Sequence, residues 1–217
     1  GKDYDVQKEP ASMTKVMTIL LALERLEMTD MVTINHDMAE AIKAITDDYV
    51  KLGPQEGEEI SVKDLVYAAV LTSANDASLA LGMYISGTEE AFCELMNAKA
   101  SEIGCLNTHF SSAYALSTPD NVTTPYDMAL ILNEAVTNTN YSEIAKTLNY
   151  TINATNKYSS VRDITNANRF INTTKFSYEY YIGGKTGSLD GHDPYGRYEW
   201  FKGFAQSKED PRKAIVV

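Results

Sequence analysis

The sequence predicts one α+β domain with an antiparallel sheet flanked by helices. Up to about residue 137 the apolar residues follow helical spacing, whereas from residue 178 onward short strand patterns alternate with Gly/Pro/Asp turns. Helices first and strands last favour α+β over an alternating α/β arrangement. With 217 residues, the chain is long enough to bury a core without disulfides or a structural metal.

The most apolar helical stretch covers residues 11–27. Its apolar residues follow the i, i+3, i+4, i+7 spacing, and its opposite face is also largely apolar; the first face consists of Val16, Ile19, Leu20 and Leu23. A helix that is apolar on most sides is buried. Residues 31–60 lack long periodicity and predict loops with short helices or strands.

Capping residues mark the helices that follow. Ser61 with Asp64 resembles a capping box, Gly104 is a typical C-terminal stop, and Pro suits a first helical turn. The predicted helices run from Ser61 to about Leu71, from about Asp76 to Ile85, over 89–103 after Thr88, and onward from Thr124-Pro125.

The composition changes to Asn, Thr, Ser and Tyr over residues 137–175, which predicts loops and short elements. Three strands are predicted after it, over Tyr178–Gly187, Glu199–Gln206 and Lys213–Val217.

Charge and composition exclude several classes of function. With 19 basic and 30 acidic residues the net charge is −11, so nucleic acid is not an expected partner. No apolar run approaches the ~20 residues of a membrane span, and the polar start GKDYDVQKEP is no signal peptide. We expect Cys93 and Cys105 to be free thiols, because about ten residues of helix hold them beyond bridging distance. No zinc-binding or EF-hand spacing occurs, so we expect neither metal nor cofactor.

The first candidate for chemistry is Ser12-Met13-Thr14-Lys15. Residues three apart share a helix face, so the Ser12 hydroxyl and the Lys15 amine can meet. A serine becomes nucleophilic when a neighbour takes its proton, and lysine can do so when burial and a second cation keep it neutral. Standing alone, the pattern is equally an ordinary helix start with an exposed lysine.

Ser73-Ala74-Asn75 and Lys185-Thr186-Gly187 are the second and third candidates. Between two helices, Ser73 can relay a proton and Asn75 can bind a substrate amide, although capping is the commoner role of such residues. Lys185 and Thr186 on a strand can bind a carboxylate, and Gly187 permits close approach of another backbone. A phosphate-binding loop is rejected because Glu179 stands where its first glycine is required.

Together, SxxK, SxN and KTG at positions 12, 73 and 185 resemble the penicillin-binding protein and serine β-lactamase superfamily. The segments PASMTKVMTILLALE, TSANDASLAL and FCELMNAKASEIGCLNTHF are most similar to low-molecular-mass D-alanyl-D-alanine carboxypeptidases. The resemblance implies a β-lactamase/transpeptidase-like fold in one domain over 1–217. A helical lobe of about 25–135 would face a sheet region formed by 1–24 and 176–217.

The resemblance also implies roles for individual residues. Ser12 would be acylated, Lys15 would be its general base and Ser73 would pass the proton to the leaving group. Asn75 would hold the substrate amide, and the terminal carboxylate would meet Lys185 and Thr186. The backbone N–H groups of Ser12 and Ser188 would form the oxyanion hole. Implied partners are peptidoglycan pentapeptides ending in D-Ala-D-Ala and β-lactam antibiotics, and the implied location is periplasmic or at the cell surface.

Several alternatives stay open. The segment WFKGFA resembles a transpeptidase strand, so a DD-transpeptidase competes with a carboxypeptidase. A class A β-lactamase is disfavoured because no ExxLN occurs between 75 and 185. A non-catalytic β-lactam or peptidoglycan sensor would be acylated once. The family fold has a strand before the first motif and a helix after the last strand, so we expect the sequence to be truncated at both ends.

Weaker candidates lie outside the three motifs. Arg197 is a possible second carboxylate contact, since arginine binds a carboxylate bidentately. A Ser-His-Asp hydrolase fits poorly because no GxSxG occurs and the histidines lack an evident nucleophile partner. The histidines are His36, His109 and His192.

Overall fold

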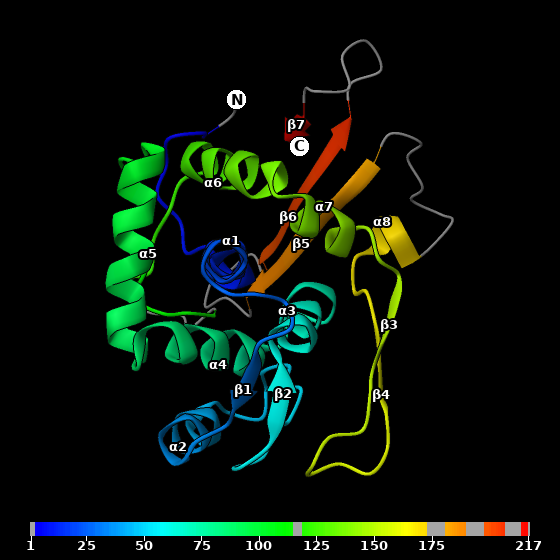
Figure 1. The fold of residues 1–217 in the computed structure, drawn as a ribbon. Coiled ribbons are helices and arrows are strands. Elements are labelled where there is room, and N and C mark those ends of the chain that lie inside the picture. Colours follow the sequence, from blue (N-terminus) through cyan, green and yellow to red (C-terminus); the bar gives the residue numbers. More distant parts are fainter. Residues whose placement is uncertain (1–2, 115–118, 173–180, 190–197, 207–213, 217) are drawn as a thin grey trace.

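A buried helix, α1 (Thr14–Arg25), lies at the centre of the structure (Figure 1). The computed structural model describes residues 3–114, 119–172, 181–189, 198–206 and 214–216. Every residue from Thr14 to Ala22 is buried, which confirms the buried helix predicted from the apolar pattern. Packed around it are α3 (Val62–Leu71), α4 (Asn75–Ser86), α5 (Glu89–Ile103) and α6 (Pro125–Thr137).

The predicted caps hold these surrounding helices at their ends. The Asp64 N–H donates to Ser61 Oγ at 3.0 Å, the Ala91 N–H to Thr88 Oγ1 at 3.2 Å, and the Asp127 N–H to Thr124 Oγ1 at 3.1 Å. Gly104 ends α5 with a φ of 94°, a left-handed conformation that glycine adopts without strain. The sequence therefore located these helices to within a residue or two.

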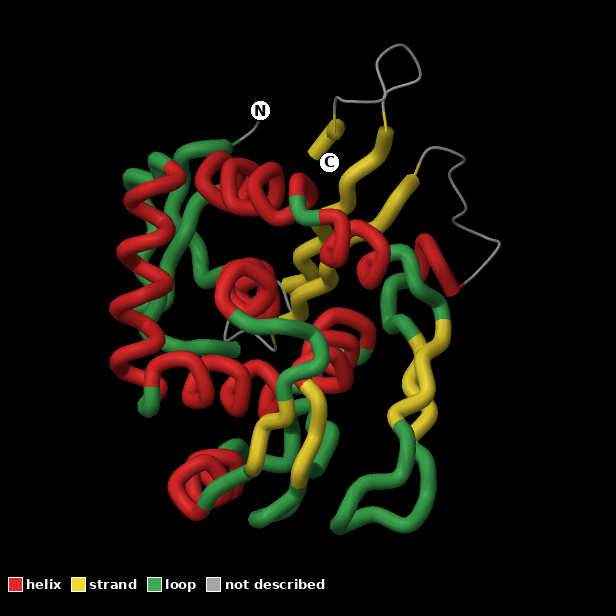
Figure 2. The backbone as a smooth tube through the Cα atoms, viewed as in Figure 1, coloured by secondary structure: helices red, strands yellow, loops and turns green. Residues whose placement is uncertain are grey.

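A three-stranded antiparallel sheet lies on one side of the helices (Figure 2). Its strands are β5 (Tyr181–Leu189), β6 (Tyr198–Gln206) and β7 (Ala214–Val216), with β6 in the middle. The strands predicted over the same segments are confirmed for the residues that the structure describes. Directly before α1, the 3₁₀ helix η1 (Ala11–Met13) packs against β5.

Two small two-stranded antiparallel sheets complete the fold. The first pairs β1 (Met31–Thr33) with β2 (Glu59–Ser61), which α2 (His36–Ala44) separates in the chain. The second is a hairpin of β3 (Asn149–Ile152) and β4 (Arg162–Thr165) within the Asn/Thr-rich stretch. Two helices flank this hairpin in the chain, α7 (Thr139–Ala145) and α8 (Arg169–Asn172).

Hydrogen bonds join the β3–β4 hairpin to the loop that precedes β2. The Tyr158 hydroxyl donates to Gly53 O at 2.5 Å. The fully buried Glu58 carboxylate accepts from Arg162 Nη2 at 2.6 Å and from Thr155 Oγ1 at 2.9 Å. These bonds hold the loop around residues 50–58 from its outer side.

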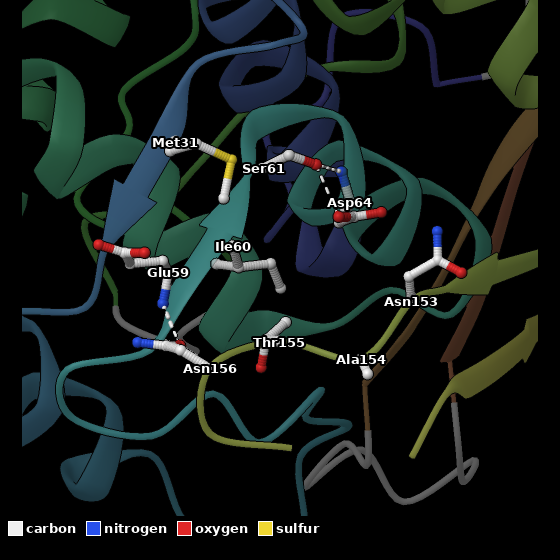
Figure 3. A pocket seen from close by; sticks show the side chains of 9 residues that line it. All are labelled: Met31, Glu59, Ile60, Ser61, Asp64, Asn153, Ala154, Thr155 and Asn156. Atoms are coloured by element: carbon white, nitrogen blue, oxygen red, sulfur yellow. Dashed lines mark hydrogen bonds between the residues drawn. The ribbon is translucent and has the colours of Figure 1, made fainter. Parts of the chain in front are cut away.

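Beside these contacts, β2 and the hairpin tip line an open pocket of about 280 Å³ (Figure 3). The Glu59 N–H donates to Asn156 Oδ1 at 2.9 Å and links β2 to the hairpin tip. None of the three motifs contributes to the lining, which consists of Met31, Glu59, Ile60, Ser61, Asp64, Asn153, Ala154, Thr155 and Asn156. The pocket is therefore separate from the candidate site.

Two further sequence expectations concern the cysteines and membrane spans. Neither Cys93 nor Cys105 forms a disulfide, as expected, and both are buried. Within the described parts of the chain, no helix is sufficiently long and apolar to cross a bilayer.

Candidate active site

The Ser12 hydroxyl and the Lys15 amine face each other where η1 runs into α1. Ser12 lies in η1, Lys15 follows in the first turn of α1, and 3.0 Å separates Ser12 Oγ from Lys15 Nζ. The lysine is fully buried, whereas Ser12 is partly exposed. The alternative interpretation of this motif, an ordinary helix start with an exposed lysine, is therefore wrong.

The SxN motif lies at the corner between α3 and α4. Asn75 is the first residue of α4, and its Oδ1 accepts from Lys15 Nζ at 2.8 Å. Ser73 has a φ of 65°, a left-handed conformation that is uncommon for a residue other than glycine. The Ala74 N–H donates to Ala68 O at 3.2 Å and ties this strained corner to α3. The motif thus connects directly to the first.

The loop before β2 fixes how the Asn75 amide is turned. The Asn75 Nδ2 group donates to Val50 O at 3.1 Å, and so does the Asn75 backbone N–H at 2.8 Å. The adjacent Asp76 carboxylate accepts from the backbone N–H groups of Leu52 at 2.9 Å and Gly53 at 2.8 Å. Since the amide nitrogen is engaged by Val50, its oxygen is left to face Lys15.

Strand β5 brings Lys185 to the same corner. Its Nζ donates to Ser73 Oγ at 2.8 Å and to Thr186 O at 2.7 Å, and the side chain is 2% exposed. A Cβ added at Gly187 would lie 3.5 Å from Met13 N and 3.4 Å from Met13 Cγ, both ordinary contacts. The strand packs on η1, and because this contact leaves space for a methyl group, packing on η1 does not itself require a glycine at position 187.

Burial and a neighbouring cation both act on the Lys15 amine. Burial lowers the pKa of Lys15 well below 10.5 and the positive charge of Lys185 lowers it further, whereas the Asp76 carboxylate opposes the shift. Burial also lowers the pKa of Lys185, to about 7. The two effects expected from the sequence to keep Lys15 neutral are both present.

The neighbours of a neutral Lys15 amine determine where its N–H groups and its lone pair point. A neutral amine carries two N–H donors and one lone pair. Two of its contacts, Asn75 Oδ1 at 2.8 Å and Tyr114 O at 2.9 Å, are oxygens that can only accept. Both N–H groups are used there, so the lone pair faces Ser12 Oγ and the serine O–H can donate to it. This is the geometry that removal of a serine proton requires.

Backbone strain is concentrated at this site. Among the described residues other than glycine, positive φ occurs at Asp3, Ala11 and Ser73. Ala11 adjoins the candidate nucleophile, and Ser73 belongs to the second motif. Each costs on the order of 1 kcal/mol and persists because the surrounding contacts determine the conformation. Strained backbone of this kind clusters at functional sites.

Not all sequence candidates join the cluster. The structure brings together Ser12, Lys15, Ser73, Asn75 and Lys185, with the Thr186 carbonyl, Gly187 and the backbone of Ser188 on the same strand. Arg197 and His192 lie outside the described residues. His36 and His109 are exposed and have no part in the site. No group of metal-ligating side chains occurs among the described residues.

The partners that orient the motif residues were not predicted from the sequence. The Tyr114 and Val50 carbonyls carry no side-chain signal, so no residue type points to them. Asp76 directly follows the second motif, and its carboxylate in a first helical turn was a detectable signal.

Comparison with known proteins identifies relatives of this chain. A family model described as D-alanyl-D-alanine carboxypeptidase matches residues 1–191. Two curated carboxypeptidases are each 36% identical: DacF of Bacillus subtilis over 67% of this chain and 36% of its own length, and DacC of Escherichia coli over 58% and 33%. A carboxypeptidase of Streptomyces K15 is 32% identical over 86% of this chain and 66% of its own length. The chain thus spans about a third of the first two relatives.

Solved structures share the fold over nearly the whole chain. A mutant of the Streptomyces K15 DD-transpeptidase matches with a TM-score of 0.81 and 26% identity, covering 98% of this chain and 81% of that one. A D-alanyl-D-alanine carboxypeptidase of Mycobacterium tuberculosis matches with a TM-score of 0.81 and 25% identity, covering 96% and 72%. These likenesses confirm the α+β, transpeptidase-like fold class.

Proposed function

The chain belongs to the D-alanyl-D-alanine carboxypeptidase family, and from this premise we propose that it is a serine peptidase acylated at Ser12. Its substrate is a peptidoglycan stem peptide ending in D-Ala-D-Ala, from which it removes the terminal D-Ala. The observation that carries the proposal is the fully buried Lys15 amine, which lies 3.0 Å from Ser12 Oγ and within 2.9 Å of two oxygens that can only accept.

Acylation begins with transfer of the Ser12 proton to Lys15 Nζ. The Ser12 oxygen attacks the carbonyl carbon of the penultimate D-Ala, and the backbone N–H groups of Ser12 and Ser188 stabilise the oxyanion. The C–N bond then breaks as Ser73 passes its hydroxyl proton to the departing amine and receives in return the proton that Lys15 took from Ser12, which leaves Lys15 neutral for the next step. Support for this relay is the position of Ser73 Oγ, 2.8 Å from Lys185 Nζ and two residues before Asn75.

Deacylation uses the same groups with water as the nucleophile. Water gives a proton to Lys15 and attacks the ester carbon, and the Ser12–acyl bond breaks as the proton returns to the serine oxygen. Asn75 holds the substrate amide, and Lys185 with Thr186 binds the terminal carboxylate. A bound carboxylate favours the protonated form of the buried Lys185 amine and so raises its pKa, which supports Lys185 in this role.

Penicillin tests the proposal, because a β-lactam mimics the substrate and remains as an acyl-enzyme. Incubation should raise the intact mass by one penicillin molecule per chain, and the matched Ser12→Ala variant should stay unchanged. An unmodified wild-type protein that is correctly folded contradicts the proposal. Release of D-alanine from a Lys-D-Ala-D-Ala peptide separates the enzyme from a sensor, and a short-lived adduct would indicate a β-lactamase.

A transpeptidase is the second candidate. The similarity to a DD-transpeptidase structure and the β6 sequence WFKGFA favour it. The test adds an acceptor amine to the peptide assay: a new amide product at the expense of hydrolysis indicates transpeptidation. Either activity places the protein where cell-wall peptides are processed, in the periplasm or at the cell surface.

A further inference from the structure

A buried segment without regular secondary structure, residues 110–114, delivers the Tyr114 carbonyl to Lys15. Phe110, Ser112 and Ala113 are fully buried and Tyr114 is 6% exposed. Side chains bond the backbone of this segment along its length. Asn97 brackets Phe110, with Nδ2 donating to its O at 2.8 Å and Oδ1 accepting from its N–H at 2.7 Å.

Closer to Tyr114, the segment is held by one carboxylate and one hydroxyl. Glu89 Oε1 accepts from the Ala113 N–H at 2.9 Å and from Ser112 Oγ at 3.1 Å. In the next peptide group, Thr18 Oγ1 donates to Ala113 O at 2.5 Å. Ala113 is thus fixed at both its N–H and its carbonyl, one residue before the carbonyl that Lys15 uses.

We propose that Glu89 is a positioning residue for the general base: by holding Ala113 and Ser112 it places the Tyr114 carbonyl that engages one Lys15 N–H. This inference rests on the proposed function. Glu89 lies in the first turn of α5 and touches neither Ser12 nor Lys15 in any bond that the structure gives, so it acts through the segment.

Two features make the position of this carbonyl consequential. With the Tyr114 oxygen in place, both N–H groups of the neutral amine are occupied and the lone pair faces Ser12 Oγ. The same oxygen also accepts from the protonated amine, which it stabilises more strongly than the neutral one. Displacement of the Tyr114 carbonyl oxygen therefore lowers both the rate of acylation of Ser12 and the pKa of Lys15. Lys185 and Asp76 remain the charged groups around the amine.

Three variants separate acceptor geometry from charge. Glu89→Ala removes the acceptor, whereas Glu89→Gln removes the charge but keeps one acceptor oxygen that can occupy the place of Oε1. Glu90→Ala is the matched control, because Glu90 lies in the same helical turn but is exposed. Thr18→Val removes the hydroxyl that holds the Ala113 carbonyl and perturbs the segment from its other side without changing any charge.

The rate of acylation by penicillin is measured from pH 5 to pH 10. A displacement of catalytic groups lowers a reaction rate by up to ~100-fold, so we expect Glu89→Ala to be acylated ~10- to 100-fold more slowly. The acidic limb of its pH–rate profile, where the rate falls as Lys15 becomes protonated, should move to lower pH. Glu89→Gln and Glu90→Ala should retain the wild-type rate and limb. Thr18→Val should change both in the same direction as Glu89→Ala.

Three results would overturn the proposal: a wild-type rate and limb in Glu89→Ala, an equal loss in Glu89→Gln, or a loss uniform over pH that leaves the limb in place. NMR titration of the Lys15 side chain in the same variants gives a reading that needs no acylation. If even the wild type resists penicillin, the proposed function fails, while the Lys15 titration still decides whether Glu89 positions the amine.

Discussion

Replacing Lys185 by methionine should change how the stability of the fold depends on pH. Lys185 is 2% exposed, and burial lowers its pKa from 10.5 to about 7. Between these two values the unfolded chain binds a proton that the folded chain does not, so stability rises with pH from 7 to 10.5. The methionine variant lacks this titration but keeps a side chain of similar length and apolar character.

The size of the effect follows from the shift in pKa. At about 1.36 kcal/mol per pKa unit, the difference between 10.5 and about 7 corresponds to roughly 5 kcal/mol over the whole window. Between pH 7 and pH 9 it is about 2 kcal/mol.

Urea unfolding at 25 °C and constant ionic strength measures this difference. The unfolding free energy of the wild type minus that of Lys185→Met should rise by about 2 kcal/mol from pH 7 to pH 9. Lys43→Met is the control, because Lys43 is an exposed lysine on α2 and its removal should leave the difference flat. A flat difference for Lys185→Met would refute the buried, deprotonated lysine.

Three more predictions concern the base, its neighbour and the hairpin contact. Lys15→Arg should abolish penicillin labelling in intact-mass analysis while circular dichroism stays unchanged, because a guanidinium does not lose its proton; normal labelling would remove Lys15 as the base. Asp76→Asn should move the acidic limb of acylation to lower pH, since the Asp76 charge raises the pKa of Lys15; a limb moved upward would contradict that role. Arg162→Met should lower the unfolding free energy by about 3 kcal/mol because it leaves the buried Glu58 without its cation, and a variant as stable as wild type in urea would show that this pair contributes little.

The helices and strands were predictable where local chemistry determines them. Thr88, Thr124 and Gly104 satisfy the backbone groups at helix ends, and such bonds depend on neighbouring residues alone. The hairpin of β3 and β4 was not located, because its Asn- and Thr-rich strands lack a clear alternation. Its place is set by tertiary contacts such as the bond from Tyr158 to Gly53.

The residues of the candidate site also fall into those that the sequence predicts and those that only the fold reveals. Ser12, Lys15, Ser73 and Asn75 were recognisable because hydroxyl, amine and amide groups in fixed spacing carry the chemistry themselves. The Tyr114 carbonyl was not, since every residue has a carbonyl and only the folded chain determines which one meets Lys15. Residues that act through such a carbonyl are hidden from the sequence for the same reason.

The protonation state of Lys15 tests the central claim most directly. The wild-type protein with ¹³C-labelled lysine can be titrated by NMR, with Lys15→Arg identifying the Lys15 signal. The expected result is a Lys15 amine that titrates well below 10.5 and is neutral when penicillin acylates Ser12. A titration at 10.5 or above would show a permanently charged ammonium and contradict its role as the base.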